Sequence, residues 1–225
     1  MRVLDLYCGA GGASTGLQRA GFDVTGIDMD EQPEYPYEFI RGDALKADVS
    51  EFNLVWASPP CQNYSIGTKG FRNNGKKYPD LIEPTRKMLL KSGKPFVIEN
   101  VPGAPIRHDL MLCGCMFNLR VFKRRYFELQ GCEVWQPIHK KHIGGVCTGE
   151  YVCTSTACVN PGCFGKRTEF KKKYGLVWKN NNLIKSWQNA LGIDWITDRK
   201  MLAEAIPPKY SEYIGKIVKN HLLEG

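Results

Sequence analysis

The first twenty residues constrain the fold more than any other part of this 225-residue chain. Val3 to Tyr7 is an apolar run that predicts a strand, Cys8 to Gly12 is a glycine-rich turn, and Ala13 to Ala20 follows with a helical pattern. A strand, a glycine turn and a helix form the first unit of a nucleotide-binding α/β fold. Glycine lets the backbone approach a ligand closely, and a helix start presents free N–H groups. The chain therefore predicts an α/β fold with a ligand at this turn.

Acidic residues mark the ends of the next strands. The second predicted strand ends at Asp28, and the third is followed by Asp43. Folds of this kind place an acid after the second strand, against ribose hydroxyls, and Met29 is suited to lie on an adenine ring. Together with Asp5, these residues put acids at three successive strand ends and predict a nucleoside cofactor. Taken singly, Asp28 and Asp43 remain equally well cap or turn residues.

A thiol follows the fourth predicted strand. The run from Asn53 to Ala57 is apolar and stops at Pro59 and Pro60, which cannot continue a ladder. Cys61 comes next, so the thiol is held on a stiff elbow at a strand end, where open α/β sheets bind ligands. Residues 64–77 predict a basic, acid-free loop beside this possible nucleophile. The alternative is a structural cysteine before an ordinary surface loop.

A carboxyl group ends the fifth predicted strand, Pro95 to Val101. Glu99 there is costly to bury without a partner, and burial raises the pKa of a carboxyl group toward values at which it donates a proton. The alternative is a glutamate that caps a helix predicted over Asp109 to Phe117. Another strand is predicted over Val121 to Leu129. The remaining expected helices span Leu183 to Leu191, Asp198 to Ile206 and Pro208 to Leu223.

The charge of the chain is unevenly distributed. The net charge is +8, yet residues 1–63 carry four Lys/Arg against ten Asp/Glu. Residues 64–77 carry four basic residues and no acid, and residues 139–173 carry seven against two. Positive charge gathered on a loop and an insertion favours a polyanionic partner, although a solvated surface accounts for the charge equally well.

The nine cysteines form no evident disulfide framework, and no apolar run is long enough to span a membrane. We therefore expect an intracellular, cytoplasmic protein with reduced thiols and no signal peptide. Four cysteines fall within 17 residues of the insertion: Cys147, Cys153, Cys158 and Cys163. Their spacing is loose for zinc. Either they staple a small module that reads DNA, or they are incidental, while Cys113 and Cys115 are predicted to be core residues of a helix.

Several of these short segments, taken in their order along the chain, resemble the motifs of the cytosine-C5 DNA methyltransferases. The resemblance covers roughly residues 1–129 and 187–218. It is carried by Asp5–Gly12, Asp28, Asp43, Ser58–Ser65, Glu99–Val101, Arg125–Phe127 and Ala203–Pro208. It implies an α/β, Rossmann-like S-adenosylmethionine-dependent methyltransferase fold, with a mixed, mostly parallel sheet and helices on both faces.

The resemblance also implies site residues and a domain plan. The catalytic residues would be Cys61, Glu99 and Arg125. The residues that would bind S-adenosylmethionine are Tyr7, Gly9, Ala10, Gly12, Asp28, Met29, Asp43, Ala44 and Pro60. Residues 1–130 would form the cofactor-binding and catalytic core, residues 131–182 a small basic, cysteine-rich insertion that serves as a reduced target-recognition region, and residues 183–225 helices that return to the core.

Some positions depart from the family pattern. Lys123 replaces the first of two arginines, and Ala203 and Glu204 replace a glycine and an asparagine near the cofactor's amino-acid end. Only about 73 residues separate Leu129 from Ala203, where the family usually has a larger recognition domain. Sequence specificity would then be short, loose or supplied otherwise.

The expected function is methylation of cytosine C5 in double-stranded DNA, through a covalent bond from Cys61 to C6 of a flipped base. The expected cofactor is S-adenosylmethionine, and zinc in the cysteine-rich insertion is left open as an addition to it. A stand-alone modification enzyme, encoded on a phage or other mobile element or within a restriction-modification system, is expected. No protein partner is indicated, and a monomer is the working expectation. Three alternatives stay open: the same chemistry on RNA or a free pyrimidine nucleotide, transfer of another group, and a non-catalytic nucleic-acid-binding module.

Overall fold

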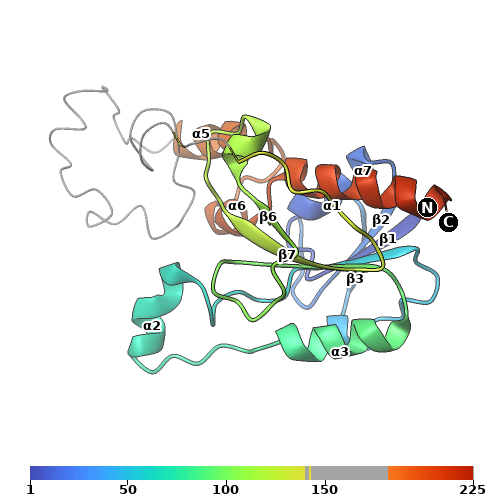
Figure 1. Cartoon of the computed structure of the whole chain (residues 1–225). Helices are drawn as coiled ribbons and strands as arrows, with labels where there is room; N and C mark the ends of the chain where they lie inside the picture. The colour runs from blue at the N-terminus through green and yellow to red at the C-terminus, as the bar shows by residue number, and fades with distance from the viewer. Residues whose placement is uncertain (140–141, 143–181, 225) are drawn as a thin grey trace, which may run out of the picture.

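The computed structural model describes residues 1–139, 142 and 182–224. Within that part of the chain, seven strands form one sheet in the order β3-β2-β1-β4-β5-β7-β6 (Figure 1). The strands are β1 (Arg2–Leu6), β2 (Asp23–Asp28), β3 (Glu38–Arg41), β4 (Leu54–Ala57), β5 (Phe96–Asn100), β6 (Leu110–Leu112) and β7 (Arg125–Gln130). β1 to β5 pair in parallel, whereas β7 is antiparallel to both β5 and β6. This mixed, Rossmann-like sheet confirms the predicted fold class.

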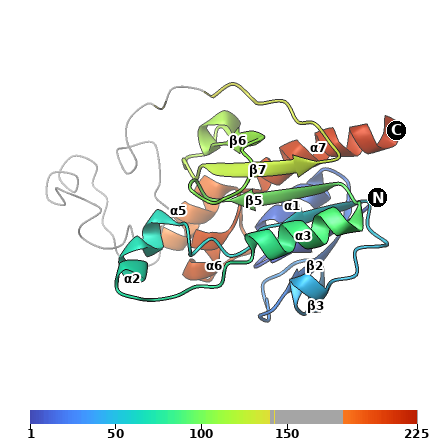
Figure 2. The same cartoon turned by 60° about the horizontal axis from the view of Figure 1, so that its bottom comes forward.

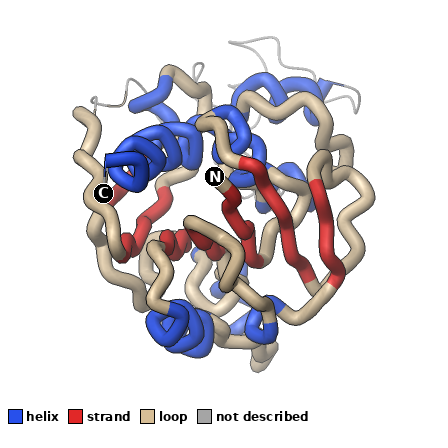
Figure 3. The backbone as a smooth tube through the Cα atoms, turned by 90° about the vertical axis from the view of Figure 1, so that its right-hand side faces the viewer, coloured by secondary structure: helices blue, strands red, loops and turns tan. Residues whose placement is uncertain are grey.

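Helices cover both faces of the sheet (Figure 3). They are α1 (Gly12–Arg19), α2 (Lys69–Asn73), α3 (Ile82–Ser92), α5 (Asn182–Leu191), α6 (Arg199–Glu204) and α7 (Pro208–Glu224), with 3₁₀ turns η1 (Ala44–Lys46), η2 (Ile66–Thr68) and η3 (Gly114–Phe117). α1 and α7 lie on one face and α3 on the other, while α2 projects beyond the sheet (Figures 1 and 2). None of the helices in the described ranges combines the length and the apolar character that crossing a bilayer requires.

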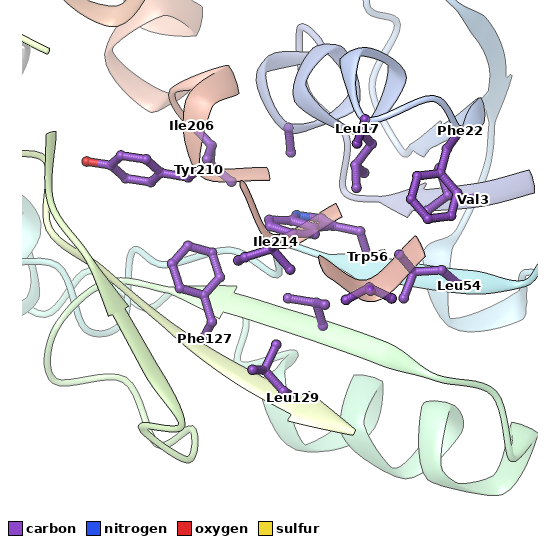
Figure 4. Packing of buried hydrophobic residues seen from close by; sticks show 14 of the residues in the cluster. Val3, Leu17, Phe22, Leu54, Trp56, Phe127, Leu129, Ile206, Tyr210 and Ile214 are labelled. Carbon is purple, nitrogen blue, oxygen red and sulfur yellow. The ribbon is translucent and has the colours of Figure 1, made fainter. Parts of the chain in front are cut away.

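Alternation along the strands builds the two core layers. Val3, Leu54 and Trp56 point to the face covered by α1 and α7, where they pack with Leu17 and Ile214 (Figure 4). Their sequence neighbours point the other way, into a second cluster under α3; these are Leu4, Leu6, Val55 and Ala57, which pack with Ile82 and Leu89. The central strands β1 and β4 are therefore buried on both sides, as expected inside a parallel sheet.

Two predicted elements were wrong. The helix predicted over Asp109 to Phe117 is instead β6 followed by η3, because residues 110–112 pair with the start of β7 and tertiary pairing overrides local propensity. The strand predicted from Val121 begins only at Arg125, since Lys123 takes a left-handed φ of 30° that breaks extended structure. The predicted loop at 64–77 contains the short helix α2.

α1 and α7 approach each other closely because glycines stand at the crossing. A Cβ built on Gly16 would lie 2.0 Å from the Pro208 carbonyl oxygen, and one on Gly215 would lie 2.9 Å from Ala20 Cβ. Neither contact tolerates a side chain without backbone movement, so these glycines set how tightly the C-terminal helix docks on the first one.

A buried carboxylate joins α3 to β7. The Arg86 guanidinium donates two hydrogen bonds to Glu128, at 2.9 and 2.8 Å, and the Arg107 backbone N–H donates a third at 3.0 Å. Glu128 is fully buried. Burial alone would raise the pKa of Glu128, but these donors outweigh it and lower the pKa below its usual value.

We predict that Gly16→Ala lowers the free energy of unfolding by about 1–3 kcal/mol, because the added methyl group overpacks the α1–α7 crossing. Chemical denaturation monitored by circular dichroism measures this. Gly70→Ala in α2 is the matched control, since its Cβ would meet nothing within 4 Å. An equal loss in both variants would contradict the packing argument.

We predict that Glu128→Gln destabilises the fold at neutral pH by about 3 kcal/mol, because it breaks a buried ion pair. A carboxyl group whose pKa is lower in the folded than in the unfolded protein stabilises the fold at pH values above its unfolded-state pKa of about 4.3. That stabilisation is lost as the pH falls through the folded-state pKa. The difference in free energy of unfolding between wild type and variant should therefore become smaller below about pH 4.3, as measured by denaturation curves at a series of pH values. Glu51→Gln, which removes an exposed ion pair with Arg2, should change little at any pH.

Candidate active site

The register of the sheet brings the predicted catalytic residues to one edge. Ala57 of β4 pairs with Leu6 on one side and Ile98 on the other, so the elbow at 58–61 lies between the ends of β1 and β5. β7 runs antiparallel to β5, with Asn100 opposite Tyr126. The start of β7 therefore meets the end of β5, which places Arg125 beside Glu99.

An ion pair occupies the end of β5. Arg125 Nε lies 2.8 Å from Glu99 Oε1, and both side chains are largely buried, at 15% and 7% exposure. Burial raises the pKa of Glu99, while Arg125, a hydrogen bond from Ser58 and the nearby Lys123 oppose that rise. The structure thus gives this carboxyl group a raised pKa, as predicted, and also supplies the partner that burial demands.

The Cys61 elbow is fixed by the strand next to it. Asn100 is 1% exposed; its Nδ2 donates to the Pro59 carbonyl at 2.9 Å, and its Oδ1 accepts from the Val101 N–H at 2.9 Å. Trp56 Nε1 donates to Ser58 Oγ at 3.0 Å. The amide of Asn100 therefore positions the elbow, a role that the sequence did not single out.

Cys61 is half-buried and surrounded by charge. Burial raises the pKa of its thiol; Arg125 opposes the rise, whereas Glu99 and Glu204 add to it. In this environment burial favours the protonated thiol of Cys61, while Arg125 favours the thiolate.

Lys123, one of the departures from the family pattern, faces the same site. Its Nζ donates to the Ala203 carbonyl at 2.5 Å. Burial and the adjacent Arg125 lower the pKa of Lys123 to about 7. The negative charges of Glu99, Cys61 and Glu204 raise it, but by less. The substitution of lysine for arginine thus places a group with a near-neutral pKa where arginine would keep a permanent charge.

The glycine turn has the geometry of a ligand cradle. Gly11 precedes α1 with φ 83°, and a Cβ on Gly9 would meet nothing within 4 Å, so space is open above the turn. The Gly9 N–H donates to Asp28 Oδ2 at 2.9 Å, which brings the β2 carboxylate to the turn. Met29, beside it, is 59% exposed.

The other predicted cofactor residues are less uniform. Asp43 caps η1 by accepting from the Leu45 N–H at 3.0 Å, and Ala44 is buried. The Tyr7 hydroxyl is 2.7 Å from Thr85 Oγ1 of α3. Asp5 does not stand at a strand end: it is fully buried within β1 and accepts from Ser14 Oγ at 2.5 Å. Burial raises the pKa of Asp5 to about 7, although the hydrogen bond from Ser14 opposes this rise. Because Ser14 belongs to α1, Asp5 anchors that helix to the sheet.

The C-terminal segment closes one side of the turn. Trp195 Nε1 donates to the Ala10 carbonyl at 2.9 Å, and a Cβ on Gly12 would lie 2.4 Å from the Ile206 carbonyl oxygen. Only the motif at 203–208 pointed to this region from the sequence. Trp195 was missed because a single tryptophan between helices carries no spacing signal.

The basic segment after Cys61 is partly engaged internally. Arg72 Nη1 donates to the carbonyls of Gln62 and Ser65, at 2.7 and 2.9 Å, so this arginine braces its own segment. Lys76 lies over the Phe71 ring, at 5.9 Å. Ile66 and Phe71 are 85% and 60% exposed, so α2 and η2 present apolar side chains to solvent.

Comparison with known proteins agrees with this geometry. Residues 1–109, which include the turn, the elbow and the end of β5, match the family model for the C-5 cytosine-specific DNA methylase. Residues 1–109, just under half of the chain, are therefore similar to the C-5 cytosine-specific DNA methylase family. The resemblance drawn from the motifs is thereby confirmed.

Individual relatives match part of the chain. The type II methylase M.HgiDII of Herpetosiphon aurantiacus is 36% identical over 118 residues, which cover 44% of this chain and 32% of that protein. The type II methyltransferase M.DdeI of Desulfomicrobium norvegicum is 30% identical over 122 residues, covering 46% and 28%. The aligned part of this chain thus spans about a third of the length of these curated relatives.

Solved structures share the fold over nearly the whole chain. A mutant of DNMT2 from Spodoptera frugiperda superposes with a TM-score of 0.61 at 14% identity, covering 97% of this chain and 99% of that one. The Dnmt2 methyltransferase of S. pombe gives 0.54 at 15% identity, covering 98% and 99%. At such identities the likeness shows the fold alone.

We predict that Asn100→Ala lowers the free energy of unfolding by about 1–3 kcal/mol, because it leaves a buried carbonyl and a buried N–H without partners. Thermal and chemical denaturation measure this. Asn63→Ala is the control: Asn63 Nδ2 also donates to a carbonyl, that of Tyr78 at 3.0 Å, but in a half-buried loop where water replaces it. If the two variants lose equal stability, burial of the Asn100 amide is not what matters.

Proposed function

We propose that this chain methylates cytosine at C5 in double-stranded DNA, with Cys61 as the nucleophile and S-adenosylmethionine as the methyl donor. The observation that carries the proposal is the convergence of Cys61, Glu99 and Arg125 at one sheet edge next to an open glycine turn. A binding module needs no buried ion pair beside a thiol, and the match of residues 1–109 to the methylase family model supports the same choice.

The turn fits the proposed cofactor. The open space above Gly9, the Asp28 carboxylate held at the turn and the exposed Met29 suit the amino-acid part, the ribose and the adenine ring respectively. Asp43 and Ala44 would complete the adenine side, while Tyr7, Ala10, Gly12 and Pro60 would frame the cofactor through their backbone. When bound, S-adenosylmethionine supplies an electrophilic methyl group.

The chain's own residues would perform the remaining steps. The Cys61 thiolate adds to C6 of cytosine, which makes C5 nucleophilic. Glu99, protonated more readily because its pKa is raised, holds N3 and the exocyclic amine, and Arg125 stabilises charge that develops at O2. Loss of the C5 proton and of Cys61 then restores the ring. This geometry requires a base outside the stack, so base flipping is part of the proposal.

A nucleic-acid polymer is the proposed substrate because of the segment beside the elbow, and similarity to the DNA methylase family favours DNA. Lys69, Lys76 and Lys77 supply positive charge there, and exposed Ile66 and Phe71 are suited to contact unstacked bases. Residues 131–182 are the proposed recognition region. Most of that region, including Cys147, Cys153, Cys158 and Cys163 and the basic run within residues 139–173, lies outside the described residues.

We predict that the protein forms a denaturation-resistant adduct with DNA that contains 5-fluorocytosine, in the presence of S-adenosylmethionine. Fluorine at C5 blocks the final elimination, so the covalent bond from Cys61 persists. Gel electrophoresis under denaturing conditions with a duplex library measures the adduct and reports its sequence context. Cys61→Ala should abolish it, and Glu99→Gln should slow its formation about 100-fold or more.

Cys132→Ala is the control, because that half-buried cysteine lies outside the elbow and its loss should leave the adduct unchanged. Matched 5-fluorocytosine RNA and free 5-fluorodeoxycytidine nucleotide run in parallel. An adduct that forms with RNA and not with DNA would show that the substrate is RNA and would contradict the DNA proposal. If S-adenosylmethionine binds but no substrate is trapped, covalent C5 methylation by this chain is refuted.

A further inference from the structure

Two cysteines and two histidines meet outside the proposed active site. The thiols of Cys113 and Cys115 and the imidazoles of His139 and His142 have donor atoms that all lie within 4.8 Å of one another. We propose that these four residues bind one structural Zn²⁺ ion. No role in the proposed methyl transfer falls to any of them, so the inference stands independently of that function.

The separations suit tetrahedral zinc. Bonds of about 2.3 Å to sulfur and 2.0 Å to nitrogen place tetrahedral ligand atoms about 3.3–3.8 Å apart. Cys113 Sγ lies 3.3 Å from His142 Nε2, at the lower end of that range, and the remaining pairs lie within 4.8 Å. The four protein ligands fill the coordination sphere, which is the mark of a structural site and not of a catalytic one.

The backbone builds the thiol half of the site. β6 ends at Leu112, Cys113 is the residue before η3, and Cys115 lies within that single 3₁₀ turn. The turn is held by the Gly114 N–H, which donates to the Phe122 carbonyl at 2.9 Å. Both thiols are buried on the side of the core, so the turn holds the two sulfur donors close together.

The imidazole half arrives after β7. The His142 ring stacks on the Phe122 ring, with centroids 4.0 Å apart and planes at 13°. The His139 ring stands nearly perpendicular to that of His142, at 4.9 Å and 71°. His139 is exposed and His142 half-buried, so the site opens to solvent on the histidine side and an ion can enter there.

The donor chemistry selects zinc over other divalent ions. Two thiolates and two imidazoles, without a carboxylate, favour Zn²⁺ and disfavour Mg²⁺ or Ca²⁺. The competing interpretation is a metal-free cluster in which a thiol hydrogen-bonds an imidazole. That interpretation accounts for pairwise contacts such as Cys113 to His142 and His139 to His142, whereas a shared metal ion accounts for the gathering of all four donor atoms within 4.8 Å of one another.

The ion would brace two segments against each other. It would tie the chain that leaves the sheet after β7 to the turn between β6 and β7, and Phe122, which stacks on one ligand, directly precedes Lys123. Since Arg125 follows two residues later, the metal would steady the strand start that carries it. A small core gains most from such a cross-link.

We predict about one zinc per chain in the purified full-length protein, measured by inductively coupled plasma mass spectrometry. Cys113→Ser and His142→Ala should each reduce the zinc content at least tenfold. Cys132→Ser keeps all four proposed ligands and should retain the metal. A variant in which Cys147, Cys153, Cys158 and Cys163 are all serine should retain it as well.

Cobalt substitution tests the ligand set spectroscopically in proteins that keep the metal. It therefore remains informative if the variants designed to lose zinc fold poorly. Co²⁺ bound to the wild type should show tetrahedral visible bands and thiolate charge transfer, and His139→Cys should keep the metal while the charge-transfer intensity rises by about half, as a third thiolate joins two. Zinc that is absent from wild type, or that persists in the Cys113→Ser, Cys115→Ser double variant, would overturn the proposal. Loss of zinc only in the four-cysteine variant would do so too.

Discussion

The antiparallel pairing of β7 with β5 is the constraint on which the candidate site depends. In a wholly parallel sheet, the neighbour of β5 would bring its carboxyl end to the edge where ligands bind. Reversal of β7 brings its start there instead, so Arg125 meets Glu99 across one pair of strands. That cation makes burial of the Glu99 carboxyl group tolerable, and the same strand end then holds the Cys61 elbow through Asn100.

Much of this arrangement could be predicted from the sequence, because local patterns determine it. The apolar runs ending in Asp28, Pro59 and Glu99 define strands whose carboxyl ends must share an edge in a parallel sheet. The register of β7 could not be predicted, since Leu110–Leu112 looks helical until a partner strand is available. Asn100 and Trp195 were also missed, because their importance lies in which carbonyl each one reaches.

The cysteines also show that spacing along the sequence does not reveal which side chains the fold brings together. The sequence drew attention to Cys147, Cys153, Cys158 and Cys163, which are close together along the chain. The four donors that the fold brings together come from two pairs separated by β7, and their spacings of one and two residues fall outside the usual patterns. Proximity in sequence and proximity in space therefore pointed to different thiols.

The contact from Trp195 to Ala10 joins residues 185 positions apart. Contacts of such sequence separation form late, because a long loop must close before they contribute stability. During synthesis, the glycine turn leaves the ribosome well before Trp195, so it stays uncovered until the residues between them have followed. Cofactor retention would therefore report that the segment carrying Trp195 has docked on the glycine turn.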